Sequence, residues 1–292
     1  MKERIGESEL ILNPDGSVFH LHLLPEDIAD TIILVGDQDR VAMVSSFFDS
    51  IEVQKRNREF ITHTGFYKGK RISAVSTGIG TDNIDIVVNE LDALVNIDLN
   101  TRIPKDEHKT LNLIRIGTSG ALQEDIPVDT PVAASIGLGF DVLINYYAGR
   151  EQISDSKMEE AFMNHTNWDK HLHTPYIVKA SDKLLKIVAK DMTSGITISA
   201  PGFYGPQGRK LRLETNDPNL NQKLENFKFG DYRITNFEME CSAIYGLSEL
   251  LGHEALTVCN IIANRYKKQY SSDYKVAVKK LVELILNRTL EL

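Results

Sequence analysis

Glycine occurs in three short stretches that follow apolar, strand-like segments, and two of these stretches also carry an arginine. Residues 36–40 read GDQDR, residues 77–80 read TGIG and residues 115–120 read RIGTSG. Glycine lets backbone N–H groups approach an anion closely, a guanidinium binds phosphate through two parallel hydrogen bonds, and a threonine hydroxyl adds a neutral donor. If the loops converge, they form a phosphate-binding cup; otherwise they are ordinary turns with arginines facing solvent. The candidate phosphate ligands are Arg40, Arg115 and Thr118.

Two carboxylates flank a methionine in the run Glu238-Met239-Glu240, which we expect at the start of a helix over residues 238–252. A buried carboxylate accepts two hydrogen bonds from vicinal sugar hydroxyls, and a methionine packs its polarizable side chain against the sugar. The alternative is simple capping, because carboxylates at a helix N-terminus are stabilised by the helix dipole.

Residues 203–209 read FYGPQGR, so an aromatic residue precedes a turn that carries a glutamine and an arginine. Stacking on Phe203 together with hydrogen bonds from Gln207 and Arg209 is what recognition of a nucleobase edge needs. The alternative is an ordinary surface loop.

Composition restricts the classes of function. The chain of 292 residues has 33 Lys and Arg against 41 Asp and Glu, a net charge of −8, which excludes a broad basic surface for nucleic acid. The two cysteines, Cys241 and Cys259, are too few for a disulfide scaffold and fall in apolar segments, so we expect buried thiols in a reducing cytoplasm. No apolar run is long enough to span a membrane. No metal site is predicted, and His171 and His173 are expected at the surface.

Hydrophobic periodicity predicts alternating strands and helices, with an exposed insertion at residues 100–109. The expected fold is a single α/β domain over residues 1–292, with a mixed central β-sheet flanked by helices. The predicted strands cover residues 31–35, 60–67, 71–76, 111–116, 195–199 and 255–263. The predicted helices cover residues 41–48, 84–95, 181–192, 238–252 and 276–290.

Taken in order, these stretches resemble the nucleoside phosphorylases of the trimeric-to-hexameric family. The resemblance runs from about residue 18 to residue 265, and the ordered set is far more specific than any single stretch. The matching residues are 18–21, 36–40, 57–60, 76–80, 115–120, 203–209, 237–240 and 264–265.

The resemblance implies reversible phosphorolysis of a pyrimidine nucleoside, with phosphate as a co-substrate and no organic cofactor. Phosphate would lie on Gly36, Arg40, Arg115 and Thr118, with Arg58 reaching in from a neighbouring subunit. The ribose would lie on Glu240, Glu238 and Met239, with His20 of the neighbour on the 5′-hydroxyl, and uracil on Phe203, Gln207 and Arg209. The catalytic set would be Arg115, Glu240, Gln207 and Arg209. A shared site implies at least a homodimer, and the family assembles as a hexamer.

The chemistry agrees with these residue types. Breaking the glycosidic bond places positive charge on the ribose and negative charge on the departing base, so a phosphate beneath the sugar and donors at the base edge both stabilise the transition state. Purine-specific relatives carry an aspartate where this chain has Asn264-Arg265, which favours a pyrimidine, and Arg265 would support the base pocket. The alternatives are a purine nucleoside phosphorylase and a nucleoside-binding module without turnover.

The chain also departs from the family pattern. Gln38 replaces a proline in the first loop, and Asn57 replaces a histidine before Arg58. Gly205-Pro206 inverts the usual order in the base loop, which makes pyrimidine preference less secure than phosphate binding. Residues 81–83 (TDN) replace smaller residues. The sequence therefore does not decide whether the subunit interface contains a monovalent-cation site.

Overall fold

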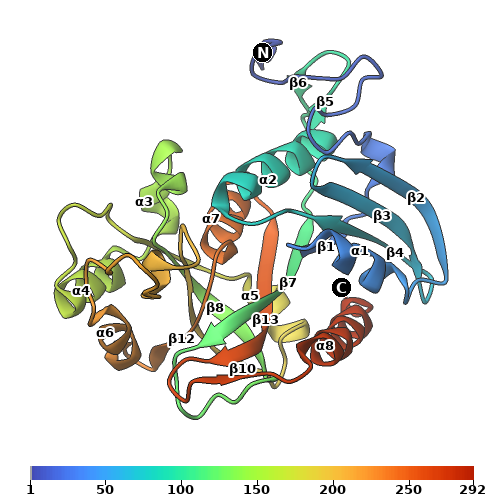
Figure 1. The fold of residues 1–292 in the computed structure, drawn as a ribbon. Coiled ribbons are helices and arrows are strands. Elements are labelled where there is room, and N and C mark those ends of the chain that lie inside the picture. The colour runs from blue at the N-terminus through green and yellow to red at the C-terminus, as the bar shows by residue number, and fades with distance from the viewer. Residues whose placement is uncertain (1) are drawn as a thin grey trace.

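A twisted mixed sheet forms the centre of the molecule in the computed structural model, which describes residues 2–292 (Figure 1). Its strands are β1 (Thr31–Val35), β2 (Ser50–Asn57), β3 (Phe60–Tyr67), β4 (Lys70–Ser76), β7 (Asn112–Ala121), β8 (Pro131–Gly139), β9 (Tyr176–Lys179), β10 (Thr193–Ser199), β11 (Lys228–Phe229), β12 (Tyr232–Glu238), β13 (Glu254–Asn264) and β14 (Gln269–Tyr270). The main strand order is β11-β12-β10-β8-β13-β7-β1-β4-β3-β2. An additional pairing of β12 with β7 closes β7, β13, β8, β10 and β12 into a ring.

Helices cover the sheet and fill the space beside the ring. They are α1 (Gln38–Ser45), α2 (Thr81–Asn96), α3 (Arg150–Ile153), α4 (Ser156–Thr166), α5 (Asp182–Ile187), α6 (Leu220–Asn226), α7 (Cys241–Leu251) and α8 (Tyr274–Thr289). Short 3-10 helices cover Pro25–Asp27, Leu143–Tyr146 and Gly205–Gln207. Helix α7 packs on α2, β8 and β13, whereas α8 packs on β13, β7 and α1. No helix within residues 2–292 is long and apolar enough to cross a membrane.

The predicted α/β fold with a mixed central sheet flanked by helices is confirmed. Strands 31–35 and 60–67 have the predicted bounds, and every residue of β1 is buried, as expected for a parallel strand covered on both faces. That residues 1–292 form one domain stays a prediction.

Two predicted boundaries near the candidate site are wrong. The strand expected to end at residue 116 continues as β7 through the glycine-rich stretch to Ala121. Gly117 is required there for close packing, since a Cβ at this position would lie 2.1 Å from Nη1 of Arg115 and 2.8 Å from the thiol of Cys259. The helix expected from residue 238 begins at Cys241, because Glu238 still pairs with Ser199 as the last residue of β12.

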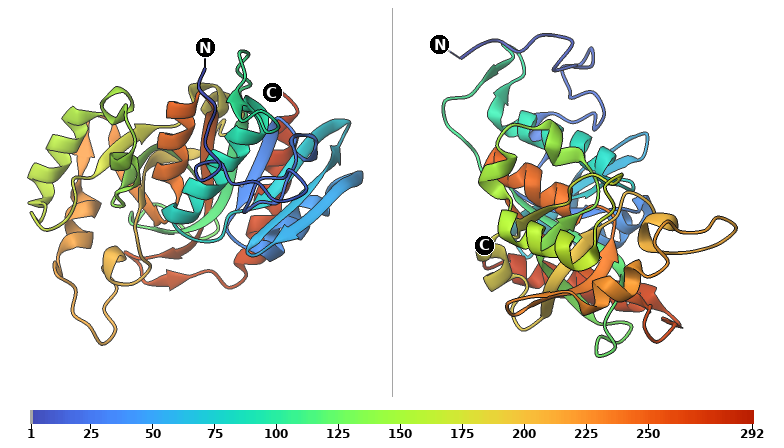
Figure 2. Two further views of the ribbon diagram at one scale, coloured as in Figure 1. Left: turned by 90° about the horizontal axis from the view of Figure 1, so that it is seen from above. Right: turned by 90° about the vertical axis from the view of Figure 1, so that its left-hand side faces the viewer.

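Other differences lie away from the site. The helix predicted over residues 181–192 ends at Ile187, and two helices, α3 and α4, lie in a region for which no helix was predicted. The insertion at residues 100–109 is mostly exposed, as predicted, and its start forms a small ladder of β5 (Ile97–Asp98) with β6 (Ile103–Pro104). The chain between the 3-10 helix Gly205–Gln207 and α6 reaches away from the body of the molecule (Figure 2).

Candidate active site

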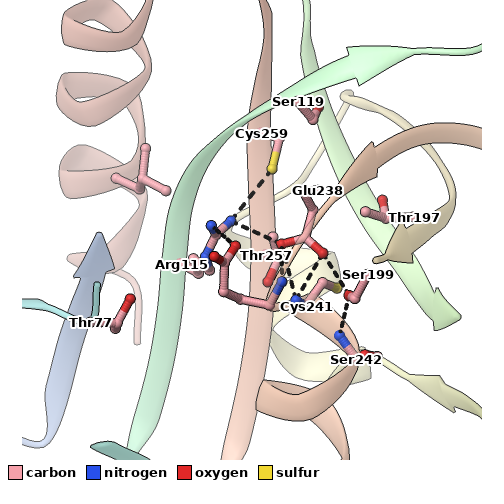
Figure 3. Close-up of polar contacts among 12 residues, drawn as sticks. Thr77, Arg115, Ser119, Thr197, Ser199, Glu238, Cys241, Ser242, Thr257 and Cys259 are labelled. Carbon is pink, nitrogen blue, oxygen red and sulfur yellow. Dashed lines mark hydrogen bonds and ion pairs between the residues drawn. The ribbon is translucent and has the colours of Figure 1, made fainter. Parts of the chain in front are cut away.

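A buried cluster of one arginine and two glutamates lies where the ring of strands closes (Figure 3). Nη1 of Arg115, on β7, lies 3.2 Å from Oε2 of Glu238 at the end of β12, and its Nη2 bonds to Oε2 of Glu240. All three residues are at most 4% exposed. The β7–β12 pairing thus brings together residues that are more than 120 positions apart in the sequence.

Burial and mutual attraction set the ionisation of this cluster. Burial opposes the charge of Arg115, but Glu240 and Glu238 outweigh it and hold the arginine pKa above its ordinary value. Burial raises the pKa of Glu238 to about 7, against the opposing effect of Arg115. The site therefore contains a fixed cation beside a carboxyl group that titrates near neutrality.

Glu238 has both carboxylate oxygens occupied by the protein. They accept hydrogen bonds from Oγ of Ser199 at 2.6 Å, from the backbone N–H of Glu240 at 2.8 Å and from the backbone N–H of Cys241 at 2.9 Å. Ser199 in turn accepts the backbone N–H of Ser242 at 2.8 Å. Glu238 thus caps the N-terminus of α7 and positions Arg115. Of the two glutamates, Glu238 is the one that fits the capping interpretation.

Glu240 has a different environment. Its Oε1 accepts the backbone N–H of Gly80 at 2.8 Å, while its Oε2 faces Arg115. Gly80 has a φ of 97° and precedes α2, a conformation that favours glycine. Met239, between the two glutamates, is partly buried. The loop after β4 and the turn before α7 therefore meet at the Glu240 carboxylate.

The predicted phosphate loops converge. They follow β1 and β4, which pair in parallel, and a Cβ on Gly36 would lie 3.3 Å from the carbonyl oxygen of Gly78. Nη1 of Arg40 donates to the carbonyl oxygen of Ile116 at 3.2 Å, and burial together with the nearby charge of Arg115 lowers the Arg40 pKa. Two desolvated guanidinium groups beside converging backbone loops form a candidate anion-binding site.

Arg115 and Thr118 differ in how they relate to this candidate anion-binding site. Nε of Arg115 is buried and has no hydrogen-bond partner among the residues that the structure describes. Thr118 lies in β7 rather than in a loop, is partly buried, and makes no hydrogen bond to Gly36, Arg40 or Arg115 in residues 2–292. Of the four candidate ligands, Gly36, Arg40 and Arg115 lie at the converging loops, whereas Thr118 lies within strand β7.

The three candidate base-binding residues lie together. The guanidinium carbon of Arg209 is 3.8 Å from the ring centroid of Phe203, and its Nη1 donates to Oε1 of Gln207. Gln207 is buried, whereas Phe203 is about half exposed. Arg265 donates to the Gln207 carbonyl oxygen, and burial together with the charge of Arg209 lowers the Arg265 pKa to about 10. The loop thus holds a buried amide and the guanidinium that bonds it beside a half-exposed aromatic ring.

His20 and Arg58 belong to two neighbouring segments of the chain. Asn57 donates to the His20 carbonyl oxygen at 2.8 Å, and the Arg58 guanidinium lies 5.6 Å from the centroid of the Phe19 ring. Gln38 fixes the same turn by donating to the Arg58 carbonyl oxygen at 3.0 Å. Neither His20 nor Arg58 makes a hydrogen bond to Arg115 or Glu240 within residues 2–292. The turn that carries Arg58 approaches the glycine loops of the same chain, since a Cβ on Gly78 would lie 3.3 Å from Cγ of Glu59.

A cavity of about 1200 Å³ opens beside the base loop. Its lining combines residues of the loops described above, including Gly80, Pro201 and Pro206, with the aromatic side chains of Phe140 and Trp168. His171 and His173, exposed as predicted, lie at its edge. The cavity reaches Gly80 and the turn at residues 205–206, but its lining does not include the candidate ligands Arg40, Arg115, Glu240, Phe203, Gln207 and Arg209.

Sequence reasoning missed several residues. The contact of Ser199 with Glu238 and that of Gly80 with Glu240 could not be predicted from the neighbouring sequence, because each joins strands or loops that are far apart in the chain.

A cluster of Asp92, His108 and His253 was also not anticipated, since it joins the insertion to two helix ends. There, Nδ1 of His253 accepts the Leu111 N–H at 3.2 Å, so Nε2, 3.2 Å from Asp92, carries the proton. With Nδ1 occupied as an acceptor and Nε2 protonated, the neutral ring has no free lone pair for a metal ion, and Nε2 makes no hydrogen bond within the described residues.

The chain belongs to the phosphorylase superfamily, whose family model matches residues 30–288. It is 29% identical over 276 residues to a uridine phosphorylase of Thermococcus kodakarensis, which covers 92% of this chain and 86% of that protein. A DeoD-type purine nucleoside phosphorylase of Alkaliphilus metalliredigens is 30% identical over 244 residues, or 83% of this chain and 85% of the relative.

A solved nucleoside phosphorylase of Trypanosoma brucei, described as showing uridine phosphorylase activity, superposes with a TM-score of 0.86. It is 29% identical to this chain, and the alignment covers 97% of this chain and all of the other. A uridine phosphorylase of Phytophthora capsici, 22% identical with a TM-score of 0.70, shares the fold.

Proposed function

We propose that this protein is a uridine phosphorylase, which converts uridine and phosphate into uracil and ribose 1-phosphate. The observation that carries the proposal is the buried contact between Arg115 and Glu240 at the point where the phosphate loops converge. An arginine for the anion and a carboxylate for sugar hydroxyls lie side by side. This is the arrangement that transfer of ribose between a base and phosphate needs.

In the proposed reaction, a phosphate oxygen forms a bond to C1′ of the ribose while the bond from C1′ to N1 of uracil breaks. The electron pair of the broken bond leaves with the base, and the base gains the proton that the phosphate gives up. Phosphate on Arg115 and Arg40 stabilises the positive charge that develops on the ribose, and Glu240 holds the 2′- and 3′-hydroxyls with Met239 against the sugar. The negative charge on the uracil carbonyls is stabilised by Gln207 and Arg209, which therefore bind the transition state more strongly than the substrate.

The environment of Asn264 supports a pyrimidine substrate. Its Nδ2 donates to the carbonyl oxygens of Gln123 and Ile126 at 2.9 Å and 2.8 Å, and its Oδ1 accepts the Lys267 N–H at 2.7 Å. An amide engaged in this way offers no acid to protonate a purine ring. We therefore assign uridine rather than inosine as the better substrate.

We further propose that the active unit is at least a homodimer and is a hexamer when fully assembled, with phosphate as co-substrate and no organic cofactor. Within residues 2–292 neither His20 nor Arg58 makes a hydrogen bond to Arg115 or Glu240, and a neighbouring subunit that supplied both side chains would complete the site. On composition, we place the protein in the cytoplasm, which cell fractionation tests.

The test is an assay of base release from uridine, thymidine and inosine, each with and without phosphate. We expect uracil release from uridine only when phosphate is present, and slower turnover of inosine. Release without phosphate would identify a nucleosidase, preference for inosine would identify a purine enzyme, and binding of uridine without turnover would identify a binding module. Glu240→Ala is the matched inactive control.

A further inference from the structure

A carboxylate of α2 holds the segment of chain that carries His20. Oε1 and Oε2 of Glu90 accept the backbone N–H of His20 at 2.9 Å and 3.1 Å, and Oε2 accepts the backbone N–H of Leu21 at 2.7 Å. Oε1 also lies 2.7 Å from Nδ1 of the His20 ring. The Glu90 side chain is only 14% exposed, so these contacts are shielded from water. One side chain thus fixes both the backbone and the ring of His20.

The Nδ1 contact determines which nitrogen of His20 carries the hydrogen. An ionised carboxylate only accepts hydrogen bonds, so Nδ1 must be the donor in this pair. In the neutral ring, Nε2 then has a free lone pair and acts as an acceptor. Nε2 makes no hydrogen bond within residues 2–292, and the His20 side chain is 27% exposed. The ring therefore has an acceptor available for a group outside this chain.

We propose that Glu90 is a positioning residue that sets the 5′ specificity of the enzyme by fixing His20 with Nε2 as an acceptor. The inference rests on the proposed function and on the family resemblance, which implies that His20 of a neighbouring subunit bonds the nucleoside 5′-hydroxyl. A hydroxyl donates its hydrogen to Nε2, whereas a 5′-deoxy nucleoside leaves that acceptor without a partner. The site therefore selects nucleosides with a free 5′-hydroxyl over their 5′-deoxy analogues.

A purely structural role for Glu90 predicts a different outcome. If Glu90 only anchored the N-terminal segment, its loss would lower turnover of every nucleoside to the same degree. If it positions His20, its loss lowers turnover of uridine but leaves 5′-deoxyuridine nearly unchanged, because that substrate makes no hydrogen bond to Nε2. The ratio of kcat/KM for the two substrates separates these roles, since a change in folding alone leaves the ratio constant.

The experiment measures phosphorolysis of uridine and 5′-deoxyuridine by the full-length protein and its variants. For the unmodified protein we expect a ratio of at least about tenfold in favour of uridine, the effect of one hydrogen bond. Glu90→Ala removes every contact. Glu90→Gln keeps the shape but cannot accept from Nδ1 and both backbone N–H groups, so both variants should lower the ratio at least about threefold. His20→Ala should lower the kcat/KM ratio to the same extent. The double variant His20→Ala, Glu90→Ala should show no further fall in this ratio.

The matched control is Asp92→Asn, which alters a carboxylate on the same helix that bonds Asn96 instead of the N-terminal segment. It should keep the ratio of the unmodified protein. An unchanged ratio in a folded Glu90 variant, an equal loss for both substrates, or no discrimination by the unmodified protein would each overturn the positioning role while leaving the proposed function intact. If the unmodified protein cleaves neither substrate with phosphate, the proposed function is refuted and this inference fails with it.

Discussion

Replacement of Arg115 by alanine tests the centre of the site. The substitution removes the cation that contacts Glu238 and Glu240 and leaves two carboxylates in one buried cluster. A charge-assisted contact to phosphate contributes about 3 kcal/mol, so its loss should lower kcat/KM for phosphate by at least roughly a hundredfold. Breaking a buried ion pair also costs stability, about 3 to 5 kcal/mol, so the unfolding temperature should fall.

The assay follows uracil release against phosphate concentration, at a temperature where circular dichroism shows the variant to be folded. Arg115→Lys keeps the positive charge but cannot bridge both carboxylates, and we expect an intermediate loss. The control is Arg233→Ala, which removes an arginine that pairs with Asp125 near the surface and should leave the kinetics unchanged. A near-normal kcat/KM for phosphate in folded Arg115→Ala would refute the assignment of Arg115 to the site.

Three further predictions concern base choice, pH and assembly. Gln207→Ala should relax discrimination among uridine, thymidine and inosine more than it weakens phosphate use; an unchanged preference would remove Gln207 from the base site. Because the folded pKa of Glu238 is raised, the folded state binds its proton more tightly, so this group's contribution to stability is lost as pH rises from about 4.5 to about 7. Glu238→Gln should flatten the pH dependence of the unfolding midpoint in that window, and an unchanged slope would count against the raised pKa. Finally, Arg58→Ala and Glu240→Ala subunits should each be inactive alone and regain activity when mixed; no recovery in verified mixed oligomers would mean that the sites are not shared.

Much of the site was predictable because its signals are local. The strand at residues 31–35 and the loop that follows it appear directly in the sequence as a buried apolar run ending in glycine. The 203–209 stretch also holds its three predicted side chains within one short loop, where neighbours in sequence are neighbours in space. Burial of both cysteines follows from their apolar surroundings.

The errors arose where tertiary packing overrides local pattern. The glycines at 117 and 120 suggest a loop, yet they lie within β7, which pairs with β13 there, and at Gly117 the packing against Arg115 and Cys259 leaves no room for a side chain. The run 238–240 was placed in a helix, whereas pairing with β10 keeps Glu238 in a strand. Neither neighbouring strand can be identified from the residues adjacent in the sequence.

The sequence by itself determined which chemical groups this protein has: a few arginines in an acidic chain, two neighbouring glutamates and a loop suited to a base. The tertiary structure alone decided how the glutamates divide their roles. The closing pair of β7 with β12 places Arg115 between them, Ser199 and the start of α7 occupy Glu238, and only Glu240 also meets the Gly80 loop. The physical reason is that burial makes each charge depend on its partners, and those partners come from strands far apart in the sequence.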